Sequence, residues 1–195
     1  MPRPVEFDRK TALHDAMLLF WRQGYYQTSV RDLTEATRLQ PGSLYGAFQS
    51  KRALFLKSLD HYSQALRTSV DAILRSDARP LARIHRFFDH LLAEQDRDRQ
   101  RKGCLLVNTL LEMPAEDAEV RDRAAGALAY VEDTFAEVLE DARCAGELPG
   151  DADPGTLAKL LMTGIFGLRV YAKTQPPPGT LAAIAKNLLR VLEQH

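Results

Sequence analysis

The chain has 195 residues, and its 26 lysine and arginine residues balance 26 aspartate and glutamate residues, so the formal net charge is zero. Its 45% hydrophobic and 27% charged residues are typical of a globular protein with a core and exclude an intrinsically disordered chain. Two cysteines are too few for a disulfide framework, the longest uncharged stretch (174–185) contains three prolines, and the first eight residues hold no apolar run. We therefore expect a cytoplasmic protein without a transmembrane helix or a signal peptide.

Helical spacing of apolar residues begins close to the N-terminus. Leu13, Met17 and Phe20 recur at intervals of four and three residues, which places them on one face of an α-helix. Gly24 is expected to end this helix, because glycine readily adopts the left-handed backbone that closes a helix.

Two short helices and a long one follow. Ser29 and Asp32 have the spacing of a capping box, which predicts a second helix to about residue 37. Pro41 suits the first turn of a third helix to about residue 48, because proline lacks the N–H that is unpaired there. Ser50 can cap a fourth helix over roughly residues 51–74.

The remainder keeps the helical period, and no segment shows the two-residue alternation of a β-strand. Five further helices are predicted, so the expected fold class is all-α with nine helices. They cover residues 80–98, 103–113, 116–145, 154–173 and 179–193.

The tight turn between the second and third helices is typical of a helix-turn-helix, placed at about residues 29–48. The second helix is expected to bury Val30, Leu33 and Ala36, and the third Leu44 and Phe48, with Leu39 between them in the turn. The opposite face of the third helix is small and polar, so an exposed position would let it enter the major groove of DNA deeply. The residues of this face are Gln40, Pro41, Gly42, Ser43, Tyr45 and Gly46.

Charge and helix propensity both favour a nucleic-acid partner for this end of the chain. Residues 1–60 hold nine basic and six acidic residues, so the remainder is correspondingly acidic. Gly42 and Gly46 each disfavour a helix by about 1 kcal/mol relative to alanine, but they permit close approach to a partner. Lys51 lies in a first helical turn, where a cation is unfavourable unless that helix end faces a phosphate. An ordinary surface lysine is the alternative.

The segment from Thr28 to Phe55, TSVRDLTEATRLQPGSLYGAFQSKRALF, resembles the DNA-binding domain of TetR/AcrR-type transcriptional regulators. The resemblance rests on the threonine before the second helix, the Gly-Ser-Leu-Tyr-x-x-Phe helix and the Lys-x-x-Leu start of the fourth. It implies a ligand-responsive regulator, most often a repressor, that binds a pseudo-palindromic double-stranded DNA operator as a homodimer. Residues 1–50 would form the DNA-binding domain and residues 51–195 an effector-binding and dimerisation domain, with no cofactor or metal.

The resemblance also assigns DNA contacts by position. Thr28, Tyr45 and Lys51 correspond to phosphate contacts that fix the register on DNA. Arg31 or Gln40 could read a purine edge, whereas glycines contribute only shape, so specificity is expected to depend partly on DNA shape. The remaining candidates for DNA binding are Ser29, Pro41, Gly42, Ser43 and Gly46.

The last two predicted helices are apolar over more than one face, which favours a symmetric interface between two copies. The resemblance implies a four-helix dimer interface; a core within one chain is the alternative. The interface candidates are Leu157, Leu161, Gly164, Ile165, Leu168, Leu181, Ile184 and Leu188.

The resemblance also implies a cavity for an unidentified small-molecule effector, which would lie among helices four to eight. Asn108 and Glu112 lie one turn apart in an otherwise apolar helix. Buried polar groups need partners, which a ligand or a neighbouring helix would provide. The aromatic candidates in this region are Phe87, Tyr130 and Phe166, although such residues are commonly ordinary core.

Cys104 is a separate effector-site candidate, because it lies at a helix start after basic residues at positions 97, 99, 101 and 102. Both features lower the pKa of a thiol and favour the reactive thiolate. The Lys-Gly-Cys-Leu-Leu stretch resembles a branch of the family in which a cysteine near this position senses electrophiles or oxidants. A buried cysteine that only packs in the core is the alternative.

The sequence shows no enzymatic constellation. His85 and His90 are five residues apart and so occupy different faces of a helix, while His14, His61 and His195 are scattered. No zinc-binding or nucleophile motif occurs. A helical adaptor that binds proteins, or an all-α enzyme, is the alternative to a transcriptional regulator.

Overall fold

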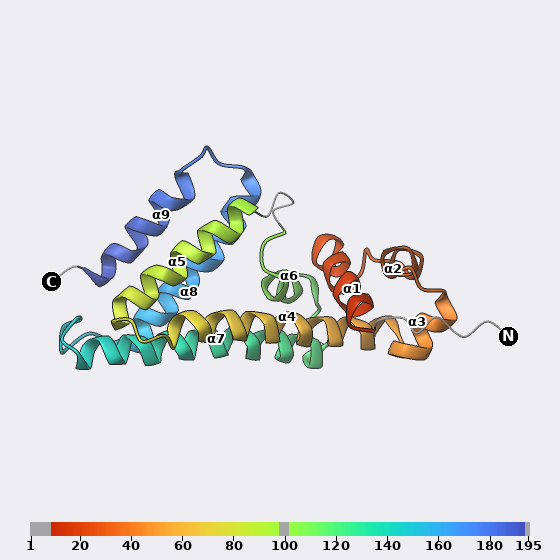
Figure 1. Cartoon of the computed structure of the whole chain (residues 1–195), viewed down its shortest axis with the longest axis horizontal. Coiled ribbons are helices and arrows are strands. Elements are labelled where there is room, and N and C mark those ends of the chain that lie inside the picture. The colour runs from red at the N-terminus through yellow and green to blue at the C-terminus, as the bar shows by residue number, and fades with distance from the viewer. Residues whose placement is uncertain (1–8, 98–101, 194–195) are drawn as a thin grey trace.

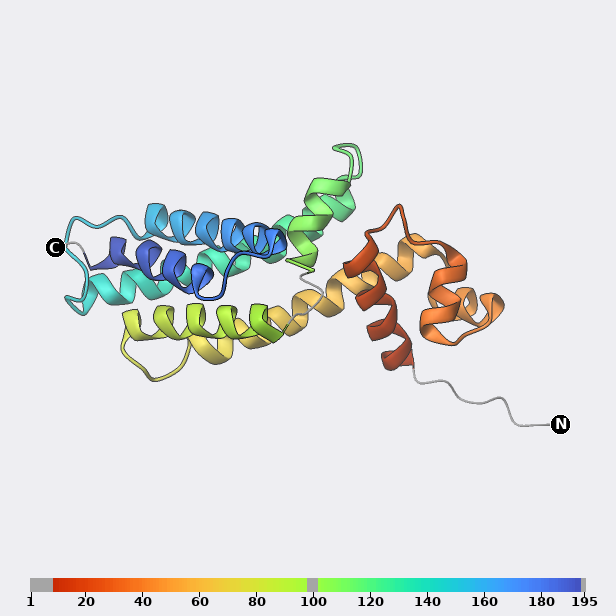
Figure 2. The same ribbon diagram turned by 90° about the horizontal axis from the view of Figure 1, so that it is seen from above.

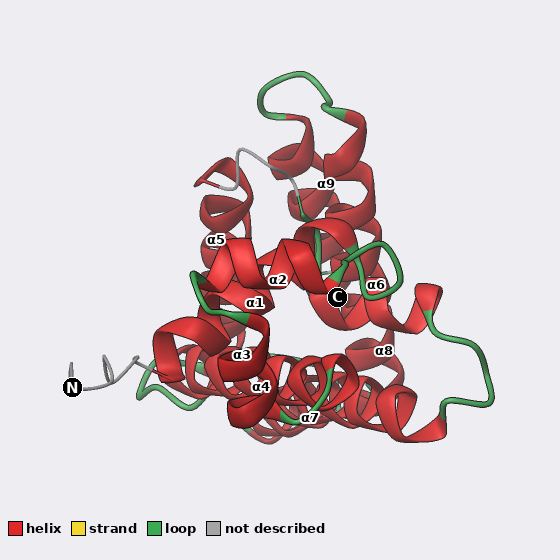
Figure 3. Cartoon of the chain, turned by 90° about the vertical axis from the view of Figure 1, so that its right-hand side faces the viewer, coloured by secondary structure: helices red, strands yellow, loops and turns green. Residues whose placement is uncertain are grey.

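The structure, a computed structural model, describes residues 9–97 and 102–193, and within these ranges it is built of helices without a strand (Figure 3). This confirms the predicted all-α fold. No helix in the described ranges is long and apolar enough to cross a membrane. The α-helices are α1 (Arg9–Gln23), α2 (Val30–Thr37), α3 (Pro41–Phe48), α4 (Lys51–Leu74), α5 (Pro80–Arg97), α6 (Leu105–Glu112), α7 (Ala118–Cys144), α8 (Pro154–Tyr171) and α9 (Thr180–Leu189), with short 3₁₀ helices η1 (Ala172–Thr174) and η2 (Arg190–Leu192).

Helix α4 links two lobes of the molecule. Helices α1, α2 and α3 lie around its N-terminal half, whereas α5, α8 and α9 lie toward the other end, beside α7 (Figures 1 and 2). The short helix α6 lies between the two groups. We call the α1–α3 group with the start of α4 the N-terminal lobe and the other group the C-terminal lobe.

The core of the N-terminal lobe forms where α2 and α3 meet α1 and α4. Leu33, Leu44 and Phe48 are buried in it, as the sequence predicts, whereas Val30 and Ala36 are only half-buried. Phe20 of α1 and Phe55 of α4 pack edge to face with ring centroids 5.0 Å apart. Buried residues of α6 and α7 also belong to this core, so it extends beyond the first 50 residues: Leu105, Leu106, Val120 and Ala124.

The core of the C-terminal lobe is a separate cluster of buried side chains. Val70 and Leu74 from the second half of α4 pack in it with Phe88 of α5, Phe135 of α7 and Leu161 of α8. The two clusters share α4, because its buried residues continue along the helix from one lobe to the other.

The capping box predicted at the start of α2 is present. The Asp32 backbone N–H donates to Ser29 Oγ at 3.1 Å, and Asp32 Oδ2 accepts the Ser29 backbone N–H at 2.8 Å. The Ser29 hydroxyl also donates to Asp32 Oδ2 at 2.7 Å. These bonds hold the pKa of the Asp32 carboxyl below its ordinary value of 3.8, with the side-chain bond from Ser29 the largest cause.

We expect Ser29→Ala to lower the free energy of unfolding by about 1 kcal/mol at pH 7, because it removes the cap of α2. The carboxylate of Asp32 stabilises the fold above its unfolded-state pKa, and this contribution is lost as the pH falls through the lowered folded-state value. The difference in the free energy of unfolding between the wild type and Ser29→Ala should therefore become smaller in acid. Urea denaturation at several pH values measures it; equal stabilities at pH 7 would contradict the role of the cap.

Candidate nucleic-acid interface and effector cavity

The outer face of α3 is exposed to solvent. Leu44 and Phe48 anchor the helix from its inner side, each with about 1% of its surface exposed. The six positions that the sequence places on the opposite face are all exposed, with Tyr45 at 37%. The predicted exposure of this face is therefore confirmed: Gln40, Pro41, Gly42, Ser43, Tyr45 and Gly46.

The two glycines of α3 are not required by packing within the chain. A methyl group added at Gly42 or Gly46 would meet no atom within 4 Å. Each glycine nevertheless costs the helix about 1 kcal/mol relative to alanine. The small size of this face is consistent with an approaching surface outside the chain.

Arg31 of α2 lies close to the start of α3. It is exposed and lines a shallow depression together with Gln40 and Pro41. The structure thus brings together, on one surface, a cation from α2 and the polar start of α3. Ser29 is also exposed, although its hydroxyl is used in the cap of α2.

Lys51 is held at the start of α4 by an aromatic ring. Its Nζ lies 4.5 Å from the ring centroid of Tyr25, a cation–π arrangement. Partial burial lowers the pKa of Lys51, while the carboxylates of Glu112 and Asp32 oppose this effect. The ammonium group is therefore fixed beside the first turn of the helix, where a phosphate would also meet unpaired backbone N–H groups.

Two residues near this surface have structural roles. Thr28 is fully buried, and its hydroxyl donates to the Gly24 carbonyl oxygen at 2.6 Å, so the predicted side-chain contact with a phosphate is corrected. Arg52, the neighbour of Lys51, forms ion pairs of 2.9 Å with Asp117 and 2.6 Å with Glu119. It attaches the start of α4 to the start of α7.

A cavity of about 520 Å³ lies between α1, α4 and α5, and we call it the central cavity. Its volume is within the range typical of small-molecule sites. Most of its wall is apolar or aromatic, from Met17, Leu18, Trp21, Tyr62, Leu66, Phe87 and Leu91.

One wall of the central cavity is polar. His90 Nε2 lies 3.2 Å from Ser69 Oγ and 3.4 Å from Glu94 Oε1. Glu94 Oε2 in turn accepts a hydrogen bond from Arg169 Nη2 at 3.4 Å. Arg169 reaches this wall from α8, and only 14% of its side chain is exposed. The cavity therefore offers an apolar body and one polar side to an occupant.

This polar wall is absent from the predictions made on the sequence. His14 and His61 are distant in sequence, but their rings lie 5.8 Å apart and both line the cavity with His90. The description of the histidines as scattered is therefore wrong for His14 and His61. Arg169 is the single charged residue in the otherwise apolar stretch 160–172. This pattern indicates a buried charge with a specific partner.

The six predicted effector residues do not gather at one site. Phe87 lines the central cavity. Asn108 bonds instead to the Lys102 carbonyl oxygen at 2.9 Å and accepts from Lys173 Nζ at 3.3 Å. Tyr130 donates to Asp71 at 2.5 Å, and Phe166 packs against the core of the C-terminal lobe.

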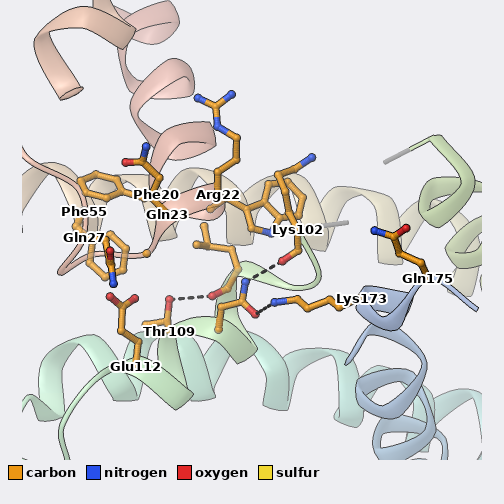
Figure 4. Close-up of a pocket in the computed structure, with 14 residues that line it drawn as sticks. Phe20, Arg22, Gln23, Gln27, Phe55, Lys102, Thr109, Glu112, Lys173 and Gln175 are labelled. Atoms are coloured by element: carbon orange, nitrogen blue, oxygen red, sulfur yellow. Dashed lines mark hydrogen bonds between the residues drawn. The ribbon is translucent and has the colours of Figure 1, made fainter. Parts of the chain in front are cut away.

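The carboxylate of Glu112 is likewise bonded to protein groups, the backbone N–H groups of Tyr25 and Tyr26. For Asn108, Glu112, Tyr130 and Phe166 the structure therefore favours contacts within the chain over a ligand. Asn108 and Glu112 do line a second, more polar cavity of about 690 Å³ between α1 and α6, shown in Figure 4.

Cys104 is buried at the N-cap of α6. Its sulfur accepts a hydrogen bond from the Tyr62 hydroxyl at 3.8 Å, and Tyr62 lines the central cavity. Burial and the neighbouring Cys104 raise the pKa of Tyr62 well above its ordinary value, so this hydroxyl remains a donor. Of the basic positions expected to activate the thiol, 99 and 101 lie outside the described residues, and the side chain at 97 is not described.

The predicted dimer residues divide between the chain's own core and its surface. Leu161, Ile165 and Leu168 are buried in the C-terminal lobe, because their stripe faces inward along α8. A methyl group at Gly164 would lie 2.0 Å from Leu188 Cδ2 of the same chain. The absence of a side chain at Gly164 therefore lets α9 pack closely against α8. For Leu161, Ile165 and Leu168 the predicted role at an interface is corrected to packing within the chain. Gly164 and Leu188 are half-buried, and their place at an interface stays a prediction.

A different face of α8 and α9 remains apolar and exposed. Leu160, Val170 and Tyr171 of α8 have 41%, 52% and 43% of their surface exposed, and Ile184 of α9 has 40%. Gly167, on the same side of α8, is also exposed. Leu157 and Leu181 are half-buried beside the lobe's core.

A helix-turn-helix with an exposed α3, joined by α4 to a helical lobe and with a cavity between the two lobes, defines a class of ligand-responsive DNA-binding regulators. Two family models match the chain: "Bacterial regulatory proteins, tetR family" over residues 12–57 and "Tetracyclin repressor-like, C-terminal domain" over residues 80–188. The chain belongs to the TetR family of transcriptional regulators.

Individual relatives agree with this assignment. The HTH-type transcriptional repressor ComR of Escherichia coli K12 is 30% identical over 193 residues, covering 97% of this chain and 90% of ComR. The transcriptional regulator AcuR of Cereibacter sphaeroides is 30% identical over 171 residues, covering 86% and 77%. A cysteine mutant of the TetR family regulator CifR, solved with 26-bp operator DNA, is 33% identical with a TM-score of 0.86, covering 96% of this chain and 98% of CifR.

We expect Lys51→Ala to weaken DNA binding equally on all duplexes, because a phosphate contact carries no base information. The slope of log affinity against log salt should decrease in magnitude by about 0.9 for each lysine lost. Fluorescence anisotropy at several salt concentrations measures this slope. Lys57→Ala, an exposed lysine further along α4, is the control; identical slopes for wild type and both variants would rule out a phosphate role for Lys51.

Proposed function

We propose that this protein is a cytoplasmic homodimeric repressor that binds a pseudo-palindromic operator and is released when a small molecule occupies the central cavity. Its role is regulatory and not catalytic. Membership of the TetR family and the resemblance to a CifR–operator complex support this assignment.

The exposed face of α3 is the single observation that carries the proposal. Within this lobe, the apolar side of α3 is fully used by the core, while its outer side is small, polar and unoccupied. Such a helix fits the major groove, which is about 12 Å wide. Arg31 and Gln40 supply the direct base contacts, Tyr45 and Lys51 bind phosphates, and the remaining positions on α3 contribute shape. Ser29 orients α2 for this contact through its cap.

Dimerisation follows from the exposed apolar face of α8 and α9. Isolated apolar residues are normal on a surface, but four large ones on adjacent helices indicate a partner. In a twofold dimer the same face of both copies is buried, so each of these residues is removed from solvent in both chains. We therefore place the four large residues Leu160, Val170, Tyr171 and Ile184 at the interface together with Gly167, and Leu157 and Leu181 at its edge.

The central cavity is the proposed effector site. Its lining fits a compound with an apolar body, which would contact Phe87, Trp21 and Tyr62, and a polar end directed to the wall of His90 and Arg169. A ligand shifts the equilibrium between two conformations only by its difference in affinity for them. The effector must therefore prefer a conformation in which the two copies of α3 no longer match the operator.

Selection of protein-bound duplexes from a random-sequence DNA library tests the DNA-binding function. We expect enrichment of an inverted repeat whose half-sites are centred about 10 base pairs apart, or a multiple of a helical turn, because a dimer places its two recognition helices in successive major grooves. Enrichment of a single half-site, or of no sequence, would contradict the proposal.

The dimer face is tested by the double variant Leu160→Glu with Ile184→Glu. A carboxylate buried at the interface loses its hydration, so we expect the dissociation constant of the dimer to rise at least about tenfold. Sedimentation velocity over a concentration series measures it. Leu111→Glu is the matched control, since Leu111 is 78% exposed on α6, away from the proposed face; equal dissociation constants for the two variants would place the interface elsewhere.

A further inference from the structure

Glu112, the last residue of α6, is bonded to the N-terminal lobe. Its carboxylate accepts hydrogen bonds from the backbone N–H groups of Tyr25, at 2.9 Å, and Tyr26, at 2.8 Å. Both belong to the turn that joins α1 to α2. Hydrogen bonds to an ionised acceptor are about twice as strong as neutral ones. Figure 4 shows Glu112 pointing from α6 toward this turn, beside Gln27.

Gly24 makes this close approach feasible. Its φ is +84°, a conformation that suits glycine, and a methyl group there would lie 2.7 Å from Glu112 Oε2. Thr28 closes the same turn through its bond to the Gly24 carbonyl oxygen, and Ser29 then caps α2. The turn held by Glu112 therefore determines where α2 begins, and α3 packs on α2.

The opposite end of α6 is bonded to residues that line the central cavity. The Gly103 carbonyl oxygen accepts hydrogen bonds from Trp21 Nε1 at 3.2 Å and Arg169 Nη1 at 3.5 Å. The Tyr62 hydroxyl donates to Cys104 at the N-cap of the helix. Trp21, Tyr62 and Arg169 would all meet an occupant of the cavity.

Helix α6 is short enough to transmit a displacement from one end to the other. Its eight residues span about 12 Å at 1.5 Å per residue. In its middle, Asn108 is bonded to Lys173, which follows α8. The helix is thus attached to the cavity and to α8 at its start, and to the turn before α2 at its end.

We propose that Glu112 is the positioning residue that couples the central cavity to the recognition helix. Its two bonds hold the Tyr25–Tyr26 turn, and through it α2 and α3, in the orientation that binds DNA. Movement of Gly103 or Cys104 when the cavity is filled would draw Glu112 away from the turn. This inference rests on the function proposed for the cavity, but its test requires no effector.

The test compares Glu112→Gln and Glu112→Ala with Glu116→Gln in the full chain. Glutamine keeps the size of Glu112 but has one acceptor oxygen, so one bond is retained; alanine retains none. Glu116 is exposed, and among the described residues no hydrogen bond to its carboxylate is seen. Affinity for the selected operator should fall about fivefold for Glu112→Gln and further for Glu112→Ala, and stay within about twofold for the control.

Hydrogen–deuterium exchange supplies a readout that does not depend on DNA. In Glu112→Ala the amides of Tyr25 and Tyr26 and those of α2 should exchange faster, while those of α8 and α9 stay unchanged. A general loss of stability would accelerate exchange throughout the chain. The local pattern therefore separates a positioning role from simple destabilisation.

A double-mutant cycle with Trp21→Phe tests the coupling through α6. Phenylalanine lacks the N–H that bonds Gly103 at the start of the helix. If α6 transmits between its two ends, the effects of Trp21→Phe and Glu112→Gln on operator affinity should be non-additive by about threefold or more.

The inference would be overturned by any of three results. These are additive effects in the double-mutant cycle, unchanged operator affinity in Glu112→Ala, and faster amide exchange across the whole chain in that variant. If the wild-type protein selects no duplex, the proposed function fails instead. The exchange pattern of α2 then still decides whether Glu112 holds the turn.

Discussion

The packing of α4 into two hydrophobic cores is the constraint on which the rest of the molecule depends. Leu54 and Leu59 of its first half are buried with α1–α3, and Val70 and Leu74 of its second half are buried in the C-terminal lobe. Because packed cores change between discrete arrangements and do not deform continuously, neither lobe can move along α4 without repacking. Buried residues of α6 and α7 also pack in the first core, so these two helices join the lobes together with α4, and polar contacts add specific links.

Two groups of polar contacts join the lobes, and they differ in how specifically they fix the parts that they connect. The ion pairs of Arg52 with Asp117 and Glu119 are accessible to solvent, since 43% of the Arg52 side chain is exposed, and accessible pairs of this kind contribute little to stability. The bonds at the two ends of α6 are more specific, since each joins a side chain to a fixed backbone group. A short helix fixed in this way at both ends can report on a cavity at one end and a DNA-binding turn at the other.

Much of the fold could be predicted from the sequence because its signals are local. The capping box at Ser29, the proline at position 41 and the cap at Ser50 each act within a few residues, and α2, α3 and α4 begin where these signals place them. The outer face of α3 could be predicted for the same reason: once Leu44 and Phe48 are assigned to the core, the opposite side of a short helix must face solvent.

The sites between helices could not be predicted in this way. The central cavity combines His14, His61, His90 and Arg169 from four helices, and their proximity depends on how those helices cross. Glu112 was correctly recognised as a polar residue needing a partner, but its partner is a backbone turn 86 residues away in sequence. The inward stripe of α8 was assigned to a dimer interface because one chain alone does not show which of two apolar faces its own core uses.

A structure of the dimer on a selected operator tests the central claim most directly. The account predicts that α3 of each copy lies in the major groove, with Gly42 and Gly46 against the base edges and Lys51 at a phosphate. The two copies of α3 would be separated by about 34–36 Å, one turn of DNA. A complex in which α3 faces away from the duplex, or in which only one copy reaches it, would contradict the account.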